Sequence, residues 1–352
     1  MITRRLRRSP FFIRLFNWEY WSFNMVYSWI MPVWFVLAAR ARSFFFFSAA
    51  NPSIEYGGFL MESKKKIYDL LDPVVYPPTL YFAAGTEAAA VRRVITTMGM
   101  QFPLIAKPDI GGQGRGVKLL QSPADIDSYA CTQVDFLIQA YIPYPNEVGI
   151  FYYRFPGAEK GHISGVVEKK MLAVTGDGLA SIRTLLLRNP RYVLQMSALE
   201  KQYGATLEEV LPAGEYRELV PYGNHARGAL FTDSTHLVTP ALEAMMDKLC
   251  KSIPGFHYGR LDIRYKDWDS LCKGESFAVI ELNGAGSEPT HMYDPKHSLF
   301  FAWKEIIRHW VILWKISRAN HANGHSYMTQ KEGLQMFRDN KQFMKKLAAI
   351  GA

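Results

Sequence analysis

Residues 258–295 read YGRLDIRYKDWDSLCKGESFAVIELNGAGSEPTHMYDP, and this stretch decides the fold of the 352-residue chain. Hydrophobic residues alternate with other residues around Asp262 and again before Glu281, which predicts two strands. Alternate residues of a strand point to the same face, so Glu281 and Asn283 project together, and a neighbouring strand would bring Asp262 beside them. Two carboxylates and an amide oxygen suit Mg²⁺ that is shared with nucleotide phosphates. Arg260 would share this face and hold a phosphoryl oxygen.

A glycine-rich segment lies upstream, where residues 102–117 read FPLIAKPDIGGQGRGV. A short buried strand is expected to end at Lys107, because the proline after it stops strand pairing. The glycines let backbone N–H groups approach phosphate oxygens closely, and the lysine adds a point charge. The lysine precedes the glycines and the loop leads to a strand, so this is neither a Walker A loop nor a dinucleotide-binding turn. A glycine-rich hairpin without a ligand is the alternative.

Together these two segments resemble the ATP-grasp superfamily, and in particular its D-alanine–D-alanine ligases. Lys107 and the glycine-rich loop are similar to the nucleotide-covering loop of those enzymes. Residues 259–262 and 281–283 are similar to their magnesium site.

The middle of the chain resembles one branch of the same superfamily, the cyanophycin synthetase-like ligases. The similar segments are residues 175–185 (TGDGLASIRTL), residues 210–215 (VLPAGE) and residues 220–229 (VPYGNHARGA). Ala229 stands where that branch has the second glycine of a pair, which is a departure from the pattern. The resemblance covers residues 60–295.

The resemblance implies an α+β fold of the ATP-grasp type, in which two α+β subdomains close on ATP. The residues themselves predict an aromatic, helical N-terminal segment in front of it. It also implies ATP and Mg²⁺ or Mn²⁺ as cofactors. In such ligases a substrate carboxylate attacks the γ-phosphate, an acyl phosphate forms, and an amine displaces phosphate to give an amide. The protein then contributes positioning and charge neutralisation.

The resemblance assigns roles to individual residues as well. The hinge that holds adenine and ribose is expected after a strand, where Gln139 stands in place of the glutamate of many relatives. Glu147 resembles the acidic residue that binds the ribose hydroxyls. One of Lys169 and Lys170 is expected to reach a phosphate or, alternatively, both only end a basic hairpin. A further lysine is expected among residues 64–66.

Three groups of residues are therefore predicted to form the site. The expected metal ligands are Asp262, Glu281 and Asn283, and the expected catalytic residues are Arg260 and Asn224. The expected nucleotide-binding residues are Lys107, Gly112, Gly114, Gly116, Gln139, Tyr141, Ile142, Glu147 and Lys170.

The chain is expected to divide into three parts. These are a basic and aromatic helical segment (1–58), an ATP-grasp domain (59–300) and a C-terminal helical region (301–352). Within the ATP-grasp domain, the glycine-rich loop belongs to a subdomain at 85–140, and a C-terminal subdomain comes after it at 141–300.

The first part is unusual, because residues 1–14 hold five arginines and no acid, and residues 20–39 hold no charged side chain. Polar residues and a proline interrupt the uncharged run, and a single span would export the arginines against the positive-inside rule. We expect a helical pair that lies in the membrane interface, with arginines on anionic headgroups. The protein would then be cytoplasmic and peripheral at the inner face of the cell membrane. The alternative is that the segment packs on the protein itself.

The composition narrows the partners. The formal net charge is +9, from 41 basic and 32 acidic residues, which suits ATP, acidic substrates or an anionic membrane. The sequence shows no zinc-finger spacing, RNP-like aromatic motif or long basic helix, so nucleic acid is not an expected partner. Three scattered cysteines fit a reducing compartment. The sequence does not predict an oligomeric state.

Three functions compete at this point. The first is an ATP-dependent, ADP-forming carboxylate–amine ligase that acts on an amino acid, a peptide-like or a lipid-linked substrate. The second is a phosphotransferase of the same fold. The third is a non-catalytic nucleotide-binding protein at a membrane, against which the complete set of Asp262, Glu281 and Asn283 argues. An amide product together with ADP and phosphate would separate the first from the second.

Overall fold

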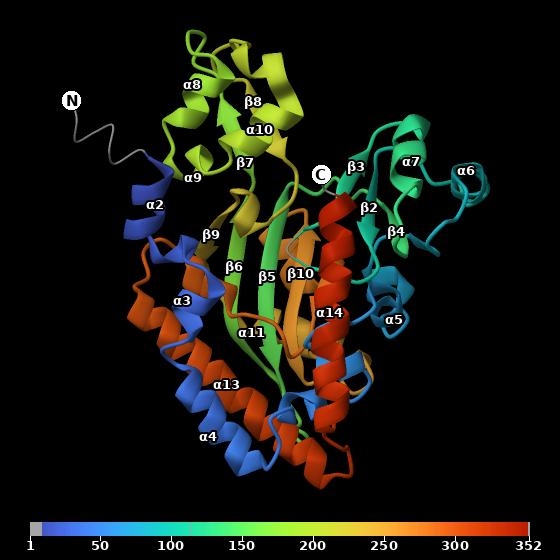
Figure 1. The fold of residues 1–352 in the computed structure, drawn as a ribbon, viewed down its shortest axis with the longest axis vertical. Coiled ribbons are helices and arrows are strands. Elements are labelled where there is room, and N and C mark those ends of the chain that lie inside the picture. Colours follow the sequence, from blue (N-terminus) through green and yellow to red (C-terminus); the bar gives the residue numbers. More distant parts are fainter. Residues whose placement is uncertain (1–8, 113, 351–352) are drawn as a thin grey trace.

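The structure, a computed structural model, describes residues 9–112 and 114–350. It is a mixed α+β fold, as the sequence predicts, and it contains three antiparallel sheets (Figure 1). A four-stranded sheet has the order β1-β4-β2-β3, a five-stranded sheet the order β11-β10-β5-β6-β9, and β7 pairs with β8. The strands are β1 (Thr79–Phe82), β2 (Leu104–Pro108), β3 (Lys118–Leu120), β4 (Phe136–Ala140), β5 (Asn146–Tyr153), β6 (His162–Lys170), β7 (Leu172–Thr175), β8 (Tyr216–Val220), β9 (Leu230–Asp233), β10 (Tyr258–Tyr265) and β11 (Phe277–Asn283).

Helices cover the sheets and form both ends of the described chain. They are α2 (Pro10–Phe16), α3 (Phe23–Tyr27), α4 (Met31–Ala41), α5 (Lys64–Tyr68), α6 (Ala88–Thr97), α7 (Pro123–Ala130), α8 (Ile182–Leu187), α9 (Pro190–Val193), α10 (Met196–Tyr203), α11 (Pro240–Ser252), α12 (Trp268–Lys273), α13 (Leu299–Ala322) and α14 (Gln330–Ile350). Short 3₁₀ turns that matter for the site are η1 (Trp18–Tyr20), η6 (His225–Arg227) and η8 (Thr290–Tyr293).

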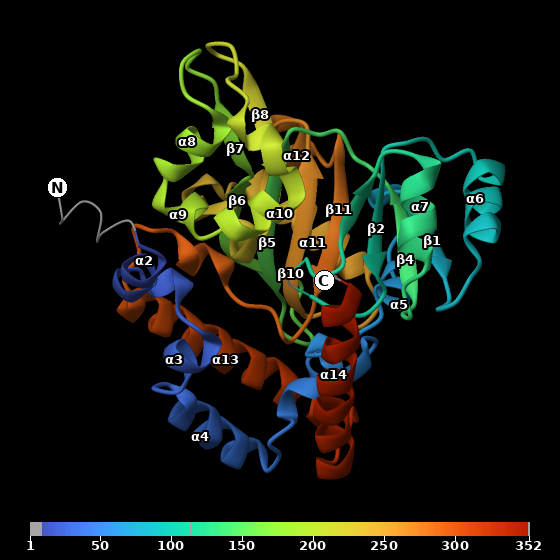
Figure 2. The ribbon, with the colours of Figure 1, turned by 45° about the horizontal axis from the view of Figure 1, so that its top comes forward.

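The four-stranded sheet presents the glycine-rich loop. Strand β2 pairs with β4 on one side and with β3 on the other, and the loop joins β2 to β3. Helices α6 and α7 pack on this sheet, where Leu104, Leu120 and Phe136 are fully buried (Figure 2). The loop is therefore held at both ends by a packed sheet.

The five-stranded sheet carries the acidic residues. Asp262 on β10 lies opposite Glu281 on β11 and opposite Gly149 on β5. The register of β10 and β11 shifts directly after Asp262. Helix α11 begins at Pro240, is capped by the Thr239 side chain, and packs against one face of this sheet. The other face is left for the site.

A small unit lies at one end of the five-stranded sheet, at the top of Figure 1. It consists of the β7–β8 pair and helices α8, α9 and α10 around a separate apolar core that includes Leu172, Ile182 and Leu219. The segments that resemble the cyanophycin synthetase branch therefore form one structural unit.

The N-terminal segment packs on the rest of the protein. Helix α4 lies along α13, with Trp34 and Leu37 in one core with Leu313 and Ile316 (Figure 2). Phe46 is completely buried in the same core. The segment is helical and aromatic as predicted, and of the two expectations for it, packing on the protein is the one observed. Among residues 9–112 and 114–350, no helix combines the length and hydropathy needed to cross a bilayer.

The packed segment is tied to the small unit by a buried ion cluster. Glu19 of η1 is 9% exposed, and its Oε2 accepts from Arg191 of α9 at 2.7 Å and meets His225 Nε2 at 3.0 Å. Burial opposes ionisation of Glu19, but His225 and Arg191 outweigh it and lower the pKa of this carboxyl. Tyr20 stacks on His225. We call these residues, Glu19, Arg191 and His225, the Glu19 cluster.

Candidate active site

A cavity of about 560 Å³ lies between the glycine-rich loop, the open face of the five-stranded sheet and the N-terminal segment. Its wall therefore combines parts that are far apart in the sequence. The residues that line it include seven cations and five carboxylates. The cations are Arg14, Lys64, Lys107, Arg115, Lys169, Arg260 and Arg264, and the carboxylates are Glu19, Glu147, Asp262, Glu281 and Glu288.

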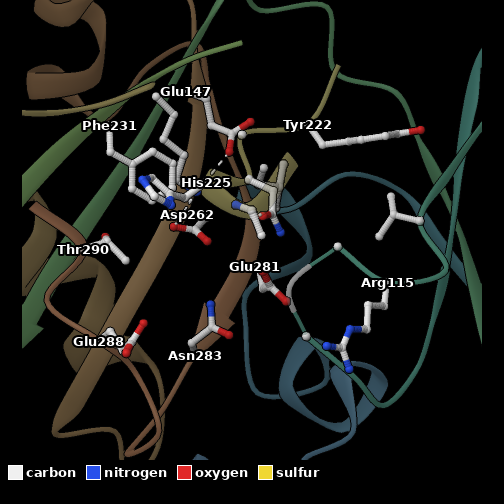
Figure 3. Close-up of a pocket in the computed structure, with 18 of the residues that line it drawn as sticks. Arg115, Glu147, Tyr222, His225, Phe231, Asp262, Glu281, Asn283, Glu288 and Thr290 are labelled. Atoms are coloured by element: carbon white, nitrogen blue, oxygen red, sulfur yellow. Dashed lines mark hydrogen bonds and ion pairs between the residues drawn. The ribbon is translucent and has the colours of Figure 1, made fainter. Parts of the chain in front are cut away.

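The three predicted metal ligands all line this cavity. Asp262 and Glu281 are cross-strand partners on β10 and β11, and Asn283 is the next residue after Glu281 on the same face (Figure 3). The alternation of the two strands thus brings these side chains together as the sequence predicts. Figure 3 also labels Glu288, which lines the same cavity and which the sequence did not predict.

Asp262 is committed to two cations. Its Oδ1 accepts from Arg260 Nε at 3.0 Å and from Lys169 Nζ at 3.0 Å, and its Oδ2 accepts from Arg260 Nη2 at 3.2 Å. The carboxyl is 3% exposed. Burial alone would raise its pKa, but Arg260 and Lys169 together lower the pKa of Asp262 to about 2. Arg260, predicted to be catalytic, is therefore held in place by the acid two residues away.

The donor set suits a divalent cation in part. Glu281 and Asn283 offer oxygen ligands of the kind that Mg²⁺ prefers, and Glu281 is contacted only by Lys64 Nζ at 3.6 Å among the ion pairs of the described chain. The Nδ2 atom of Asn283 is buried without a hydrogen-bond partner in the described structure. Within that same part of the chain, no three His, Cys, Asp or Glu side chains are close enough to hold a metal by themselves. Asp262 could join the other two only by sharing its oxygens with its cations.

Lys107 stands at the end of β2 with no carboxylate partner among the described ion pairs. Its Nζ donates to Tyr68 Oη at 2.8 Å, to Gln139 Oε1 at 2.9 Å and to the Ile280 carbonyl at 3.1 Å. The residue is 6% exposed. Burial lowers the pKa of Lys107 to about 8, although Glu281 opposes this shift. A buried cation that is solvated only by neutral oxygens is a strong site for an anion.

Gln139 supports Lys107. Its Oε1 accepts from the lysine and its Nε2 donates to Thr79 Oγ1 at 2.7 Å, so the side chain is fully engaged and only 3% exposed. The residues after it, Tyr141 and Ile142, line the cavity as expected for a hinge. The ring of Tyr141 also lies 5.8 Å from the Arg264 guanidinium.

The structure resolves the alternatives among the lysines. Lys64 lines the cavity and donates to the Gly111 carbonyl at 2.6 Å, whereas Lys65 and Lys66 pair with surface acids. At the end of β6, Lys169 lies in the cavity and is 8% exposed. Lys170, the predicted nucleotide-binding residue, is exposed outside it, because consecutive strand residues point to opposite faces. The choice of Lys170 was wrong in position, and its neighbour occupies the site.

Glu147 lies in the cavity but is already paired. Its Oε1 is 3.0 Å from Lys169 Nζ and its Oε2 is 3.3 Å from Arg264 Nε, and the residue is 5% exposed. Gly223 packs so closely that a Cβ there would lie 2.2 Å from Oε1. The contact of Glu147 with ribose hydroxyls stays a prediction, and its observed partners are cations.

The glycines of the loop have different roles. Gly112 and Gly114 line the cavity. Gly116 does not line it; its φ is +71° and a Cβ would lie 2.7 Å from the Pro108 ring, so this glycine permits the turn. Asn224, the second predicted catalytic residue, lines the cavity across from Gly114 and caps η6 through a hydrogen bond from the Ala226 N–H to its Oδ1.

Other residues of the cavity were not predicted from the sequence. Arg115 lies inside the glycine-rich loop (Figure 3). A basic residue among these glycines was a sequence feature from which its place in the cavity could have been predicted. Arg264 shares the strand face of Asp262 and could have been found by the same alternation. Glu288 and the aromatic residues of the N-terminal segment gave no local signal, because tertiary packing alone brings them to the cavity. These aromatic residues are Tyr20, Trp21, Phe23 and Tyr27.

Comparison with known proteins gives distant matches only, and no protein-family profile matches the chain. The bifunctional glutathione biosynthesis protein GshAB of Streptococcus thermophilus is 23% identical over 215 residues, which are 54% of this chain and 28% of that protein. The chain therefore matches little more than a quarter of the length of this curated relative.

Solved structures of ATP-grasp ligases are similar as well. The D-alanine–D-alanine ligase of Bacillus anthracis has 14% identity and a TM-score of 0.39, over 72% of this chain and 68% of its own. The VanG D-Ala:D-Ser ligase of Enterococcus faecalis has 13% identity and a TM-score of 0.40, over 72% and 61%. The chain is distantly similar to ATP-grasp ligases. This agrees with the resemblance drawn from the sequence, and at these identities and TM-scores the likeness remains distant.

Proposed function

We propose that the protein is an ATP-dependent, ADP-forming carboxylate–amine ligase. The observation that carries this proposal is the arrangement of Lys107 and the Glu281–Asn283 pair around one cavity. Lys107, which has no carboxylate partner among the described ion pairs, lies on the same cavity wall as two side chains with oxygen ligands, and of these Glu281 is paired with Lys64 at 3.6 Å. A nucleotide triphosphate with its divalent cation matches both halves of this arrangement.

The cations of the cavity have separate roles in this proposal. Lys107, Lys64 and Arg115 bind the phosphates, and the glycines at 112 and 114 let the backbone approach them. Glu281 and Asn283 would hold Mg²⁺, with Asp262 as an outer partner, and the ion would neutralise phosphate charge during transfer. Tyr141 and Ile142 would hold the base at the hinge.

The reaction then needs little covalent help from the protein. A substrate carboxylate oxygen attacks the γ-phosphorus, ADP leaves, and an acyl phosphate forms. The nitrogen of an amine attacks the acyl carbon, phosphate leaves, and the amide forms with loss of a proton. Arg260, which is half-buried, and Lys169, which is buried, both lie beside Asp262 and would place positive charge where the acyl phosphate lies.

A coupled ADP-release assay tests the ligase proposal. Purified protein with MgATP is offered carboxylates together with a panel of amino acids and simple amines, with and without a lipid extract. We expect ADP release that requires both a carboxylate and an amine, with one phosphate and one amide formed per ADP. ADP release with phosphate retained on an organic product would favour the phosphotransferase instead.

We also propose that the N-terminal helices bind an anionic membrane surface. The outer faces of these helices expose large apolar side chains, among them Phe11, Phe16, Trp29 and Phe35, which are 56–75% exposed. Exposed arginines accompany them at 14, 40 and 42. Aromatic and aliphatic groups next to arginines are the chemistry of an interfacial anchor. Four further arginines, at 4, 5, 7 and 8, lie outside the described residues.

A further inference from the structure

We propose that Glu288 and Thr290 bind the ammonium group of the substrate amine. This inference rests on the proposed ligase function, because it assigns the second substrate of that reaction to one end of the same cavity. The two residues come after strand β11, in the segment that leads into η8, and both line the cavity (Figure 3).

The Glu288 carboxylate accepts hydrogen bonds from two neutral donors. Its Oε1 accepts from Tyr27 Oη at 2.5 Å, and its Oε2 accepts from Tyr293 Oη at 3.1 Å. Among the described residues it forms no ion pair. Arg260 is the nearby cation, but this guanidinium donates to both oxygens of Asp262 and to the Glu288 carbonyl. The glutamate therefore keeps an unmatched negative charge toward the cavity.

Thr290 provides a second and independent sign of a ligand. The residue is 8% exposed and lines the cavity, yet its Oγ1 has no hydrogen-bond partner in the described structure. A buried hydroxyl without a partner costs free energy, so such groups are rare unless a ligand or water completes them. The hydroxyl oxygen can accept one N–H of an ammonium group while the carboxylate accepts another.

Aromatic side chains surround this end of the cavity. Phe23 and Tyr27 stack at 4.1 Å, and both reach the cavity from the N-terminal segment, while Tyr293 reaches it from η8. Burial and the neighbouring Glu288 raise the pKa values of Tyr27 and Tyr293, so both hydroxyls stay protonated donors. A carboxylate among aromatic rings favours a cation over a neutral or anionic group.

The matching ligand is a primary ammonium group, as in a free amino acid or a peptide N-terminus. Both sources share the chemistry that Glu288 recognises, and they differ in the carboxyl end, which is free in an amino acid and an amide in a peptide. The N-terminal segment would then supply part of the amine site, since Tyr27 orients the carboxylate. The competing hypothesis is that Glu288 binds a second divalent cation, in addition to the one proposed at Glu281.

Equilibrium binding tests the inference without relying on turnover. The full-length protein, with MgADP present, is titrated with alanine, alanine amide, dialanine, methylammonium and N-acetylalanine, and binding is followed by calorimetry and thermal shift. We expect the first four to bind and N-acetylalanine not to bind. Tighter binding of alanine than of alanine amide and dialanine would indicate a free amino acid, and tighter binding of dialanine and alanine amide than of alanine would indicate a peptide N-terminus.

Two variants sharpen this test. Glu288→Gln keeps acceptors for Tyr27 but removes the charge, and should weaken ammonium binding roughly 10- to 100-fold. Thr290→Val removes a hydroxyl that has no protein partner, so the fold should be retained while ammonium binding falls by a smaller factor. The affinity for ADP should be unchanged in both, which separates a lost ammonium site from a lost cavity.

Several outcomes decide the matter. Equal alanine affinity in the wild type and both variants overturns the inference, and so does binding of none of the ammonium probes by the wild type. A Glu288→Gln variant that shifts the Mg²⁺ requirement but not ammonium binding assigns Glu288 to the metal and also overturns it. Wild-type ammonium binding that depends on Glu288, in a protein that never releases ADP, supports the site and contradicts the ligase proposal.

Discussion

Two buried lysines on the wall of one cavity differ in their surroundings. Lys169 lies between two carboxylates, Glu147 and Asp262, each 3.0 Å from its Nζ, and they raise its pKa although burial alone would lower it. Lys107 has only neutral oxygens around it, and burial lowers its pKa to about 8. The first lysine is matched by the protein, and the second is left for a ligand. The charges around Lys169 therefore stabilise one another, whereas the charge of Lys107 is available to a ligand.

The largest effect is expected where a matched charge is removed. Lys169→Met should lower the free energy of unfolding by about 3–5 kcal/mol, because Glu147 and Asp262 lose a shared buried partner. Chemical denaturation of the variant measures this loss. Lys170→Met is the matched control one residue away; that side chain is exposed, so we expect a change within about 0.5 kcal/mol. Equal effects of the two changes would break the comparison.

The next effect concerns catalysis. Glu281→Gln should reduce ADP release by about 10²–10³-fold, since the lost charge faces the cavity, where phosphate charge develops. Steady-state assays over a range of Mg²⁺ concentrations measure it, and circular dichroism should show an unchanged fold. Glu275→Gln, an exposed change in the same β10–β11 connection, is the control. Unchanged turnover in the Glu281 variant would remove this residue from the proposed metal site.

A smaller effect is expected for the unmatched lysine itself. Lys107→Met should weaken ATP binding by about 1.5–3 kcal/mol, the range for hydrogen bonds to charged groups. Protein stability should be retained or increased, because a buried cation without a counterion is removed. Calorimetry measures the affinity, and Lys65→Met on the surface of α5 is the control. An unchanged ATP affinity would contradict the assignment of Lys107 to phosphate.

The same lysine predicts a pH dependence. In the free protein Lys107 loses its proton near pH 8, well below the usual range of lysine. Bound phosphate favours the charged form, so ATP affinity should be constant below about pH 8 and should fall as the pH rises above it. Titrations of the Lys107→Met variant should not show this fall. An identical profile in both proteins would assign the pH dependence to another group.

The smallest effect is expected for an exposed arginine that forms no ion pair among the described residues, and it concerns membrane binding. Arg42→Gln should weaken binding to anionic vesicles by about 1 kcal/mol at low salt, and the difference should fade as salt screens the charge. Flotation with phosphatidylserine vesicles measures it. Arg93→Gln on α6 removes the same charge at the far side of the molecule (Figure 2) and should have no effect. Wild-type protein that stays unbound at low salt would end the membrane proposal.

The part of the site that lies on the sheet could be predicted from the sequence, and the other walls of the cavity could not. Strand alternation and a two-residue spacing suffice to predict that Asp262, Glu281 and Asn283 meet, because register fixes them locally. Which of Lys169 and Lys170 faces inward depends on the pairing of β6 with β5, which includes a register shift. That choice was not readable from the chain, and it was predicted wrongly.

The sequence also did not predict which residues the side chains of the site and of the N-terminal segment contact. Gln139 was expected to contact the nucleotide, which stays a prediction, and the sequence did not show that this side chain also holds Lys107 and Thr79 across three strands. The N-terminal segment was expected to be a helical pair at a membrane. The spacing of its aromatic residues shows no amphipathic pattern that would indicate which part of the protein they pack against. Its packing on α13 depends on contacts more than 270 residues apart, as in the bond from Trp303 Nε1 to the Val26 carbonyl.

The Glu19 cluster lies between the regions of the two proposed binding events. It joins the N-terminal segment to the small unit beside the cavity, through Arg191 and His225. If lipid contact shifts the position of η1, and the shift changes ligand affinity by some factor, then the ligand must change lipid affinity by the same factor. Substrate in the cavity would then change the affinity of the N-terminal segment for lipid. Glu19→Gln would remove this coupling between ligand binding and lipid binding.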